Sequence, residues 1–459
     1  MRESFNFFKK AFRTIMSVLE STEIKLETAI SPKVKADDLC VTTTNTNTDA
    51  ARSGGRLRRK KCAILMMYSG WGFYGMQRCP VFPTIEGELS KALFACGQLE
   101  SLTGEEHKKF HFQRASKTDK SVSALGQVCS MLLGENNDLI SKLNDALPEN
   151  IRILDIIRTT RCFSAKGSCS HRVYDYLLPT FALSPSSFST SLNDSSCWNY
   201  RVTAEQITRA NHLLGRYQGT HNFYNFTSGR LATDKSCNRF IISAECMPAF
   251  LLGEHEYTLI RITGQSFMLH QIRKMIGLML AILKDYTQED IFDLVFQRER
   301  VDIPKAPGLG LMLNQVDFSQ YNQKYQNDGI HDPIDWSKYE ERRDKFKLQY
   351  VYEHIDRVET EEKSMYEWLL TLNNHTYTYR DSSEHTATIN NNNNINNNNA
   401  ETLETSESIV PLDDVGNADD KSTHIDDDDD DDNGNVVTTT DDVIKDDSDI
   451  PLKRERLAL

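Results

Sequence analysis

Strand-like and helix-like segments alternate through the middle of this chain, and this alternation limits the possible folds more than any other feature. Short apolar runs typical of strands lie at residues 61–68, 110–115, 125–133, 151–158, 172–178, 240–246 and 256–262. Helices are expected at residues 84–99, where Thr84 is the cap, at residues 203–215, which open with a capping box, and at residues 267–283. This order predicts an α+β protein of two lobes, each an antiparallel sheet backed by helices.

Both ends of the chain differ in composition from the middle. Residues 31–55 are rich in Thr, Asn, Ser and Gly, and asparagine runs within 390–399 precede consecutive aspartates at 426–432. Such segments cannot bury enough apolar surface to offset the entropy of ordering, so we expect a linker and a disordered tail. The expected organisation is a leader and linker (1–55), a first lobe (56–190), a second lobe (191–320), an added helical segment capped at Ser337 (321–373) and a disordered acidic tail (374–459).

Net charge divides along the chain in the same way. The total of −13 comprises 0 for residues 1–51, +7 for residues 52–320 and −20 for residues 321–459. A body of positive charge can bind a polyanion even when the whole chain is acidic. We expect the tail to be solvated; the alternative is that it covers the basic groove and competes with loosely bound nucleic acid.

Two classes of protein are disfavoured because their patterns are missing. The longest apolar run, residues 276–283 with one glycine, is far shorter than the roughly 18 residues of a membrane helix. Ten cysteines are scattered singly, without a Cys-x-x-Cys pair or a histidine spacing that completes a zinc site. We therefore expect no membrane span and no bound metal, with reduced thiols buried in the core.

Targeting signals point in two directions. Apolar residues at positions 5, 8, 12, 15 and 19 have helical spacing with basic side chains on other faces, as in an organelle transit peptide. The glutamates Glu3 and Glu20 favour instead a surface helix or an unstructured leader. Basic runs at 56–61 and 453–456 suit either nuclear import or contact with nucleic acid. The expected location is the nucleus, with the mitochondrion as a second site.

One aspartate lies in a polar loop between two apolar strands. Asp119 has Lys117 and Lys120 beside it, and we expect their charges to hold the pKa of this carboxyl low, available as a nucleophile or base. The alternative is that Asp119 only forms a turn. Structural and functional interpretations are also both open for Tyr174, which is either an aromatic residue at the edge of the core or a stacking platform for a base. The same holds for the aromatic loop at residues 219–226, which has packing on the core as its structural interpretation.

An arginine on an otherwise apolar helix is a further candidate. Arg273 lies within residues 264–277, and a buried guanidinium needs an anion.

Taken in order, these stretches resemble the TruA family of tRNA pseudouridine synthases. The matching segments are residues 68–77, 118–119 with 124–127, 163–166 with 172–174, 219–223 and 267–277. They cover roughly residues 60–320 in one unbroken order. Met76, Ser123 and residues 176–180 resemble the eukaryotic branch often called pseudouridylate synthase 1.

The resemblance implies a two-lobed pseudouridine synthase fold with a basic cleft, and roles for single residues. Asp119 would be the essential carboxylate, acting on a flipped-out uridine, either by attacking the sugar or by removing the C2′ proton. Tyr174 would stack on the target uracil and assist proton removal at C5, and Arg273 would pair with Asp119. No cofactor or metal is implied. Residues implied to bind substrate are Lys117, Lys120, Arg172, Arg78, Lys274, His221 and Phe267, with residues 56–61 at the rim.

Two positions depart from the family pattern. Lys117 stands where the family usually has arginine, and so lacks the planar fork that makes two-point contacts. Ser121 stands where the family usually has glycine, which matters only if the position needs a positive φ. Both substitutions point toward a slow or narrowly selective enzyme.

The sequence therefore predicts an RNA pseudouridine synthase that acts on tRNA, with spliceosomal and messenger RNA as further substrates and a monomer favoured. The first alternative is an RNA-binding or RNA-folding protein that has kept the fold but lost the activity. The second is a hydrolase that uses Asp119 and His221, although no serine or cysteine elbow is recognisable.

Overall fold

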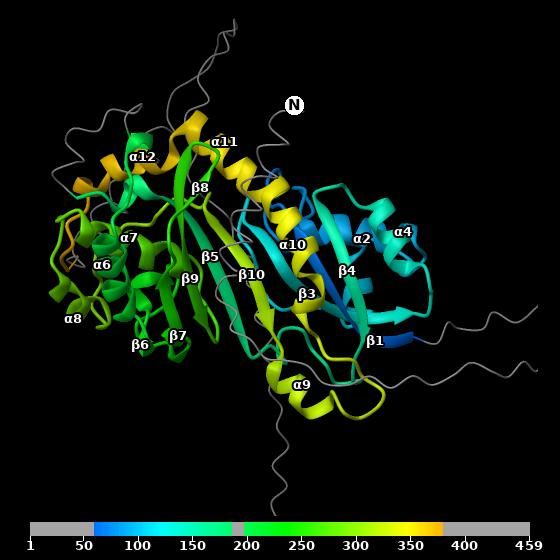
Figure 1. The fold of residues 1–459 in the computed structure, drawn as a ribbon. Coiled ribbons are helices and arrows are strands. Elements are labelled where there is room, and N and C mark those ends of the chain that lie inside the picture. Colours follow the sequence, from blue (N-terminus) through cyan, green and yellow to red (C-terminus); the bar gives the residue numbers. More distant parts are fainter. Residues whose placement is uncertain (1–58, 186–196, 380–459) are drawn as a thin grey trace, which may run out of the picture. The chain divides into compact units, whose positions relative to one another are not determined.

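A computed structural model describes residues 59–185 and 197–379, all of which belong to one compact unit (Figure 1). The strands are β1 Arg59–Tyr68, β2 Gln113–Arg114, β3 Ser123–Gly134, β4 Ile151–Arg158, β5 His171–Pro179, β6 Gly219–Asn222, β7 Asn238–Cys246, β8 Phe250–Leu252, β9 His255–Gly264 and β10 Leu311–Asp317. The α-helices are α2 Ile85–Ala95, α3 Gly104–Lys109, α4 Leu139–Ala146, α6 Ala204–Gly215, α7 Gln271–Leu283, α8 Phe292–Val295, α9 Ser319–Tyr325, α10 Glu340–Phe346, α11 Glu353–Glu362 and α12 Ser364–Leu370.

Short helical turns complete the list of elements. The 3₁₀ turns are η1 Thr180–Leu183, η2 Cys197–Asn199, η3 Tyr224–Phe226, η4 Lys235–Cys237, η5 Glu289–Ile291, η6 Trp336–Tyr339 and η8 Leu372–Asn374. A π-helical segment, η7 Lys347–Tyr352, joins α10 to α11.

All ten strands form one mixed sheet. Eight of them follow the order β4-β1-β3-β10-β5-β9-β7-β6, while β2 pairs with β3 and β8 pairs with β9. Every pairing is antiparallel except β10 with β3, which is parallel and joins only Met312 to Ser123 and Leu313 to Ala124. The α+β class is confirmed, and the sheet is continuous across this narrow junction; the division into two lobes and the basic cleft stay predictions.

Helices cover the sheet, so several strands are buried on both faces. In β1, every residue from Lys61 to Tyr68 is buried, which explains why this strand is a continuous apolar run. Near the other end of the sheet, Tyr217 in the segment after α6 donates a hydrogen bond from its hydroxyl to the carbonyl of Met275 in α7 (2.8 Å). These contacts build one hydrophobic core that includes residues of both ends of the sheet.

The C-terminal helices run along the sheet from β4 toward β8 (Figure 1). In α10, the buried Arg343 donates to the backbone carbonyls of Leu125 (3.0 Å) and Asn314 (2.8 Å). Further along, Tyr352 in η7 stacks on Phe250 of β8, with centroids 6.1 Å apart. One helical layer therefore contacts strands on both sides of the β10–β3 junction.

Several expected boundaries are wrong at their ends. Helix α2 stops at Ala95, because Gly97 takes a left-handed φ of +69°. Helix α7 starts at Gln271 because His270 has a φ of +64°. The expected cap at Ser337 is replaced by Asp335, which caps the turn η6 that leads into α10; its carboxylate accepts from the backbone N–H of Ser337 (3.0 Å).

The strand expected at residues 110–115 is largely wrong as well. It shortens to the two residues of β2, because α3 precedes it and His111 has a φ of +52°.

The folded part of the chain reaches at least Tyr379. Tyr377 is buried and donates its hydroxyl to the Leu372 carbonyl (2.7 Å), and Tyr379 forms a β-bridge with Val301. The N-terminal leader, the linker and the Asn- and Asp-rich tail lie outside the described residues, as do the basic residues 453–456. Within the two described ranges, no helix is long and apolar enough to cross a membrane.

Candidate active site

The loop that carries Asp119 is held at its start by a buried amide. Gln127 of β3 is fully buried; its Nε2 donates to the carbonyl of Ser116 (2.8 Å), and its Oε1 accepts from the N–H of Ser116 (3.3 Å). Both polar ends of the amide are thus satisfied by the loop, as burial requires. The backbone at Ser116 is therefore fixed three residues before Asp119.

Asp119 itself opens a tight turn. The N–H of Val122 donates to the Asp119 carbonyl (3.1 Å), and Ser121 has a φ of +62°. The position that holds glycine in the family pattern does adopt the left-handed region here, at a cost of about 1 kcal/mol for a serine.

A second loop packs against this turn from the β1 side. The N–H of Ser121 donates to the Phe73 carbonyl (3.1 Å), and the N–H of Met76 donates to the Thr118 carbonyl (3.0 Å). At Gly75, a Cβ would lie only 2.7 Å from the Thr118 carbonyl oxygen, so this contact needs glycine. The two loops are therefore one rigid unit around the half-buried Asp119.

Tyr174 of β5 comes next to this unit. It is 7 % exposed, and its hydroxyl lies 2.7 Å from the Ser116 hydroxyl. Phe267 contacts its ring edge-on, with centroids 5.3 Å apart. Burial is the main cause that raises the pKa of Tyr174 to about 12; the hydrogen bond with Ser116 opposes this rise, and the negative charge of Asp119 adds to it. Asp119 is thus near enough to act electrostatically on this phenol, which stays protonated at neutral pH.

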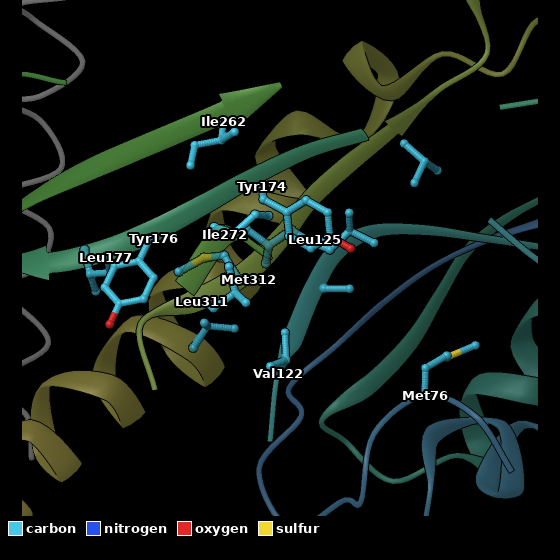
Figure 2. Close-up of a cluster of buried hydrophobic side chains, with 14 of the residues drawn as sticks. Met76, Val122, Leu125, Tyr174, Tyr176, Leu177, Ile262, Ile272, Leu311 and Met312 are labelled. Carbon is cyan, nitrogen blue, oxygen red and sulfur yellow. The ribbon is translucent and has the colours of Figure 1, made fainter. Parts of the chain in front are cut away.

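Arg273 of α7 acts on the next phenol of the same strand. The Tyr176 hydroxyl donates to the Pro307 carbonyl (2.7 Å), and Arg273 Nε donates to the Ala306 carbonyl (2.7 Å). Burial raises the pKa of Tyr176 well above its usual value, and the charge of Arg273 opposes this rise. Figure 2 shows Tyr174 and Tyr176 on the same side of β5, between side chains of β3, β9, β10 and α7. Asp119 and Arg273 therefore influence one face of β5; their direct pairing stays a prediction.

Both arginines among the residues expected to bind substrate have fixed contacts of their own. Arg172 donates to the carbonyls of Gln265 (2.6 Å), Ala115 (2.9 Å) and Lys166 (3.3 Å), so it also ties the Asp119 loop to β9. Arg78 donates to the Leu102 carbonyl.

Two of the lysines contact different loops. Lys120 places its ammonium 4.5 Å from the centre of the Tyr74 ring. Lys274 donates to the Asn225 carbonyl (3.0 Å), in the aromatic loop of the second half. Lys117 is exposed.

His221 lies apart from these residues. It is on β6, three strands from β5 in the sheet order, or about 14 Å at the usual strand spacing. Its ring stacks on Phe296 (4.2 Å, 17°) and its Nε2 is 2.9 Å from the Gln218 carbonyl. The structure does not bring His221 to Tyr174, and its role in substrate binding stays a prediction.

Ser116, Gln127 and Tyr176 were not among the expected site residues. Gln127 lies inside a matching segment and Tyr176 lies in residues 176–180, which resemble the eukaryotic branch, but only the tertiary contacts show what the two side chains hold in place. In the described part of the chain, no group of three or more His, Cys, Asp and Glu side chains is arranged to hold a metal ion.

Comparison with known proteins shows which family the sequence resembles. A family model described as "tRNA pseudouridine synthase" matches residues 214–319. The mouse protein "Pseudouridylate synthase 1 homolog" is 43 % identical over 325 residues, covering 70 % of this chain and 76 % of its own. The human protein of the same name is 44 % identical over 317 residues (68 % and 73 %). "tRNA pseudouridine synthase 1" of Kluyveromyces lactis is 32 % identical over 373 residues (65 % and 67 %).

The chain belongs to the TruA family of tRNA pseudouridine synthases, which are isomerases. Within that family, it falls in the eukaryotic branch of pseudouridylate synthase 1.

Proposed function

We propose that this protein converts uridine to pseudouridine in tRNA, with Asp119 as the essential carboxylate and without a metal or cofactor. The N1–C1′ bond breaks, the uracil turns, and C5 bonds to C1′; C5 loses a proton and N1 gains one. The observation that supports this most is geometric: the loop of Asp119 contacts Tyr174 of β5, whose hydroxyl lies 2.7 Å from that of Ser116. Arg172 of the same strand donates to the Ala115 carbonyl at the start of that loop (2.9 Å).

Each residue has a proposed role. Asp119 attacks C1′ or removes the C2′ proton, and Arg273 pairs with it and keeps it charged. Tyr174 stacks on the uracil, which its edge-on contact with Phe267 helps to orient. Its protonated phenol favours this stacking role over the removal of a proton at C5.

RNA binds, in this proposal, in a basic cleft between two lobes, because residues 52–320 carry a net charge of +7. Lys117, Lys120, Arg172, Arg78, Lys274, His221 and Phe267 are the proposed contacts. Spliceosomal and messenger RNA are proposed as further substrates. A monomer in the nucleus, with a mitochondrial fraction, completes the proposal; imaging and light scattering of the full chain test those two points.

The test is an Asp119→Ala variant. We expect pseudouridine formation on total tRNA to vanish while RNA affinity changes little, because the carboxylate serves the chemistry and the basic residues serve binding. Asp145→Ala, on the exposed face of α4, is the matched control and retains activity. If the wild-type protein forms no pseudouridine in any tRNA, the proposal is wrong and a non-catalytic RNA-binding role replaces it.

A further inference from the structure

Two aromatic side chains beside the Asp119 loop are nearly half exposed. Tyr74 and Phe82 are 44 % and 46 % exposed, and their rings stack with centroids 4.2 Å apart and planes 13° from parallel. The ammonium of Lys120 lies 4.5 Å from the centre of the Tyr74 ring. Tyr74 therefore contacts both a parallel ring and a cation, and both rings of the stack stay accessible to a ligand.

The loop that presents these rings is rigid. Pro80 and Pro83 flank the Val81–Phe82 tip and fix their own φ angles. The N–H of Tyr74 donates to the Pro83 carbonyl (2.8 Å), which closes the loop at its base. A ring held in this way loses little conformational entropy when a ligand stacks on it.

The stack is joined to the proposed catalytic loop. Lys120 follows Asp119 directly, and the backbone of Ser121 bonds to that of Phe73, next to Tyr74. Trp71, also exposed, contacts the ring of His354 (4.3 Å) and so belongs to a different contact. A ligand on the outer face of Phe82 would therefore extend from the site where the target uridine is proposed to bind.

We propose that Phe82 and Tyr74, with Lys120, form a stacking platform for an unpaired nucleobase that neighbours the target uridine in the RNA. Exposed aromatic faces bind bases of any type, and the cation favours the adjacent phosphates. This inference rests on the proposed function and extends it from the reacting uridine to its neighbours along the strand.

The experiment uses the full chain carrying Asp119→Ala, so that binding is measured without turnover. The probe is a tRNA transcript with 2-aminopurine beside a uridine that the wild-type protein modifies. We expect quenching of its fluorescence on binding. Phe82→Ala and Tyr74→Ala should weaken RNA affinity by about 5- to 150-fold, the range of one base–aromatic stack, and abolish the quenching.

Two further variants separate stacking from folding. Phe82→Trp keeps an aromatic face and should retain affinity and quenching. Phe94→Ala removes an aromatic that is equally exposed (46 %) but lies at the end of α2, about 14 Å along that helix, and should change nothing.

The RNA affinities of the Phe82 variants show whether the stacking platform exists. If Phe82→Ala binds the RNA as tightly as the chain with an intact Phe82, the proposal is wrong, even if the variant no longer binds some protein partner. The proposal is also wrong if Phe82→Trp loses as much RNA affinity as Phe82→Ala. If the wild-type chain makes no pseudouridine in any tRNA but Phe82→Ala still weakens tRNA binding and Phe82→Trp does not, the platform stands and the proposed activity fails.

Discussion

Asp119 and Asp175 are two carboxylates near the same strand, and their surroundings are opposite in kind. Asp175 points away from the Tyr174 face and is 2 % exposed; Arg261 donates to both of its oxygens (2.8 Å each), and Asn314 adds a third bond (2.9 Å). Asp119 is half-buried in a turn, and its sequence neighbour Lys120 is exposed. Side chains on strands thus hold Asp175, whereas backbone bonds position the loop of Asp119.

The difference separates a structural charge from a chemical one. When a bidentate arginine and an amide bind the oxygens of a carboxylate, its hydrogen-bonding capacity is already used within the folded protein. Such a carboxylate gains little further stabilisation from contact with a substrate. One on a rigid loop beside a buried phenol can act on a group that enters. If this contrast is correct, equivalent substitutions at the two positions have different consequences.

Asp119→Asn should have the largest effect. We expect the rate of pseudouridine formation to fall by at least 10²–10⁴-fold, because the amide is neither a base nor a nucleophile of comparable strength. The free energy of unfolding should change less than in Asp175→Asn, because Asp119 is half-buried and the backbone bonds of its turn remain in the variant. Single-turnover assays and urea unfolding measure the two quantities. A large loss of stability would remove the contrast with Asp175.

Asp175→Asn should show the reverse. The substitution leaves the Arg261 charge without its partner, and because the side chain of Arg261 is 39 % exposed, water offsets part of the loss. We expect the free energy of unfolding to fall by about 2–3 kcal/mol, measured by urea unfolding at pH 7. The fraction that remains folded should keep its activity at low temperature; inactive folded protein would contradict a structural role.

Tyr174→Phe sharpens the comparison through pH. The pKa of Tyr174 is raised to about 12 in the folded protein, from the usual value near 10, mainly by burial. The contribution of this phenol to stability is complete below pH 10 and is lost as the pH rises from 10 to 12, at about 1.4 kcal/mol per pH unit. At pH 8 the variant should be about 1 kcal/mol less stable, because it lacks the bond to Ser116.

The order of stability should then reverse before pH 12. Urea unfolding of the wild type and Tyr174→Phe across this range isolates this one phenol from the other buried tyrosines. A constant difference between the two proteins would show that Tyr174 titrates normally and is not buried in solution as it is in the structure.

Ser121→Gly should have the smallest effect. Glycine relieves the cost of a φ of +62°, whereas Ser121→Ala retains that cost and is the matched control. We expect Ser121→Gly to be about 0.5–1 kcal/mol more stable than Ser121→Ala in thermal unfolding. Equal stabilities would mean that the turn is not strained, and would weaken the view of the Asp119 loop as a rigid unit.

Features that depend on neighbouring residues were predictable from the sequence. The capping box forms as expected, with the side chain of Thr203 accepting from the N–H of Gln206 and that of Gln206 accepting in return, and helix α6 ends at Gly215. The run at residues 151–158 forms β4 with those bounds. In contrast, the start of α7 depends on the left-handed backbone of His270. The sequence does not predict this conformation, because residues other than glycine adopt it only rarely.

Features that depend on distant residues were not predictable. The strand β10 was not among the expected strands, and its place between β3 and β5 could not be predicted, because parallel pairing joins segments far apart in the sequence. The family pattern named Asp119, Tyr174 and Arg273, but the buried contacts of Gln127 and Tyr176 appear only when strands meet. Conversely, His221 fits the pattern and yet lies three strands from Tyr174.

The position of β10 affects when the protein can become active during its synthesis on the ribosome. Asp119 and Tyr174 are synthesised early, but the strand that separates and aligns their two strands is made only at residues 311–317, and Arg343, which bonds across that joint, is made later still. A nascent or prematurely terminated chain that stops before residue 311 contains each of the three proposed catalytic side chains but lacks the strand that aligns β3 with β5. Such fragments should be inert, so activity begins only when nearly the whole folded body has left the exit tunnel.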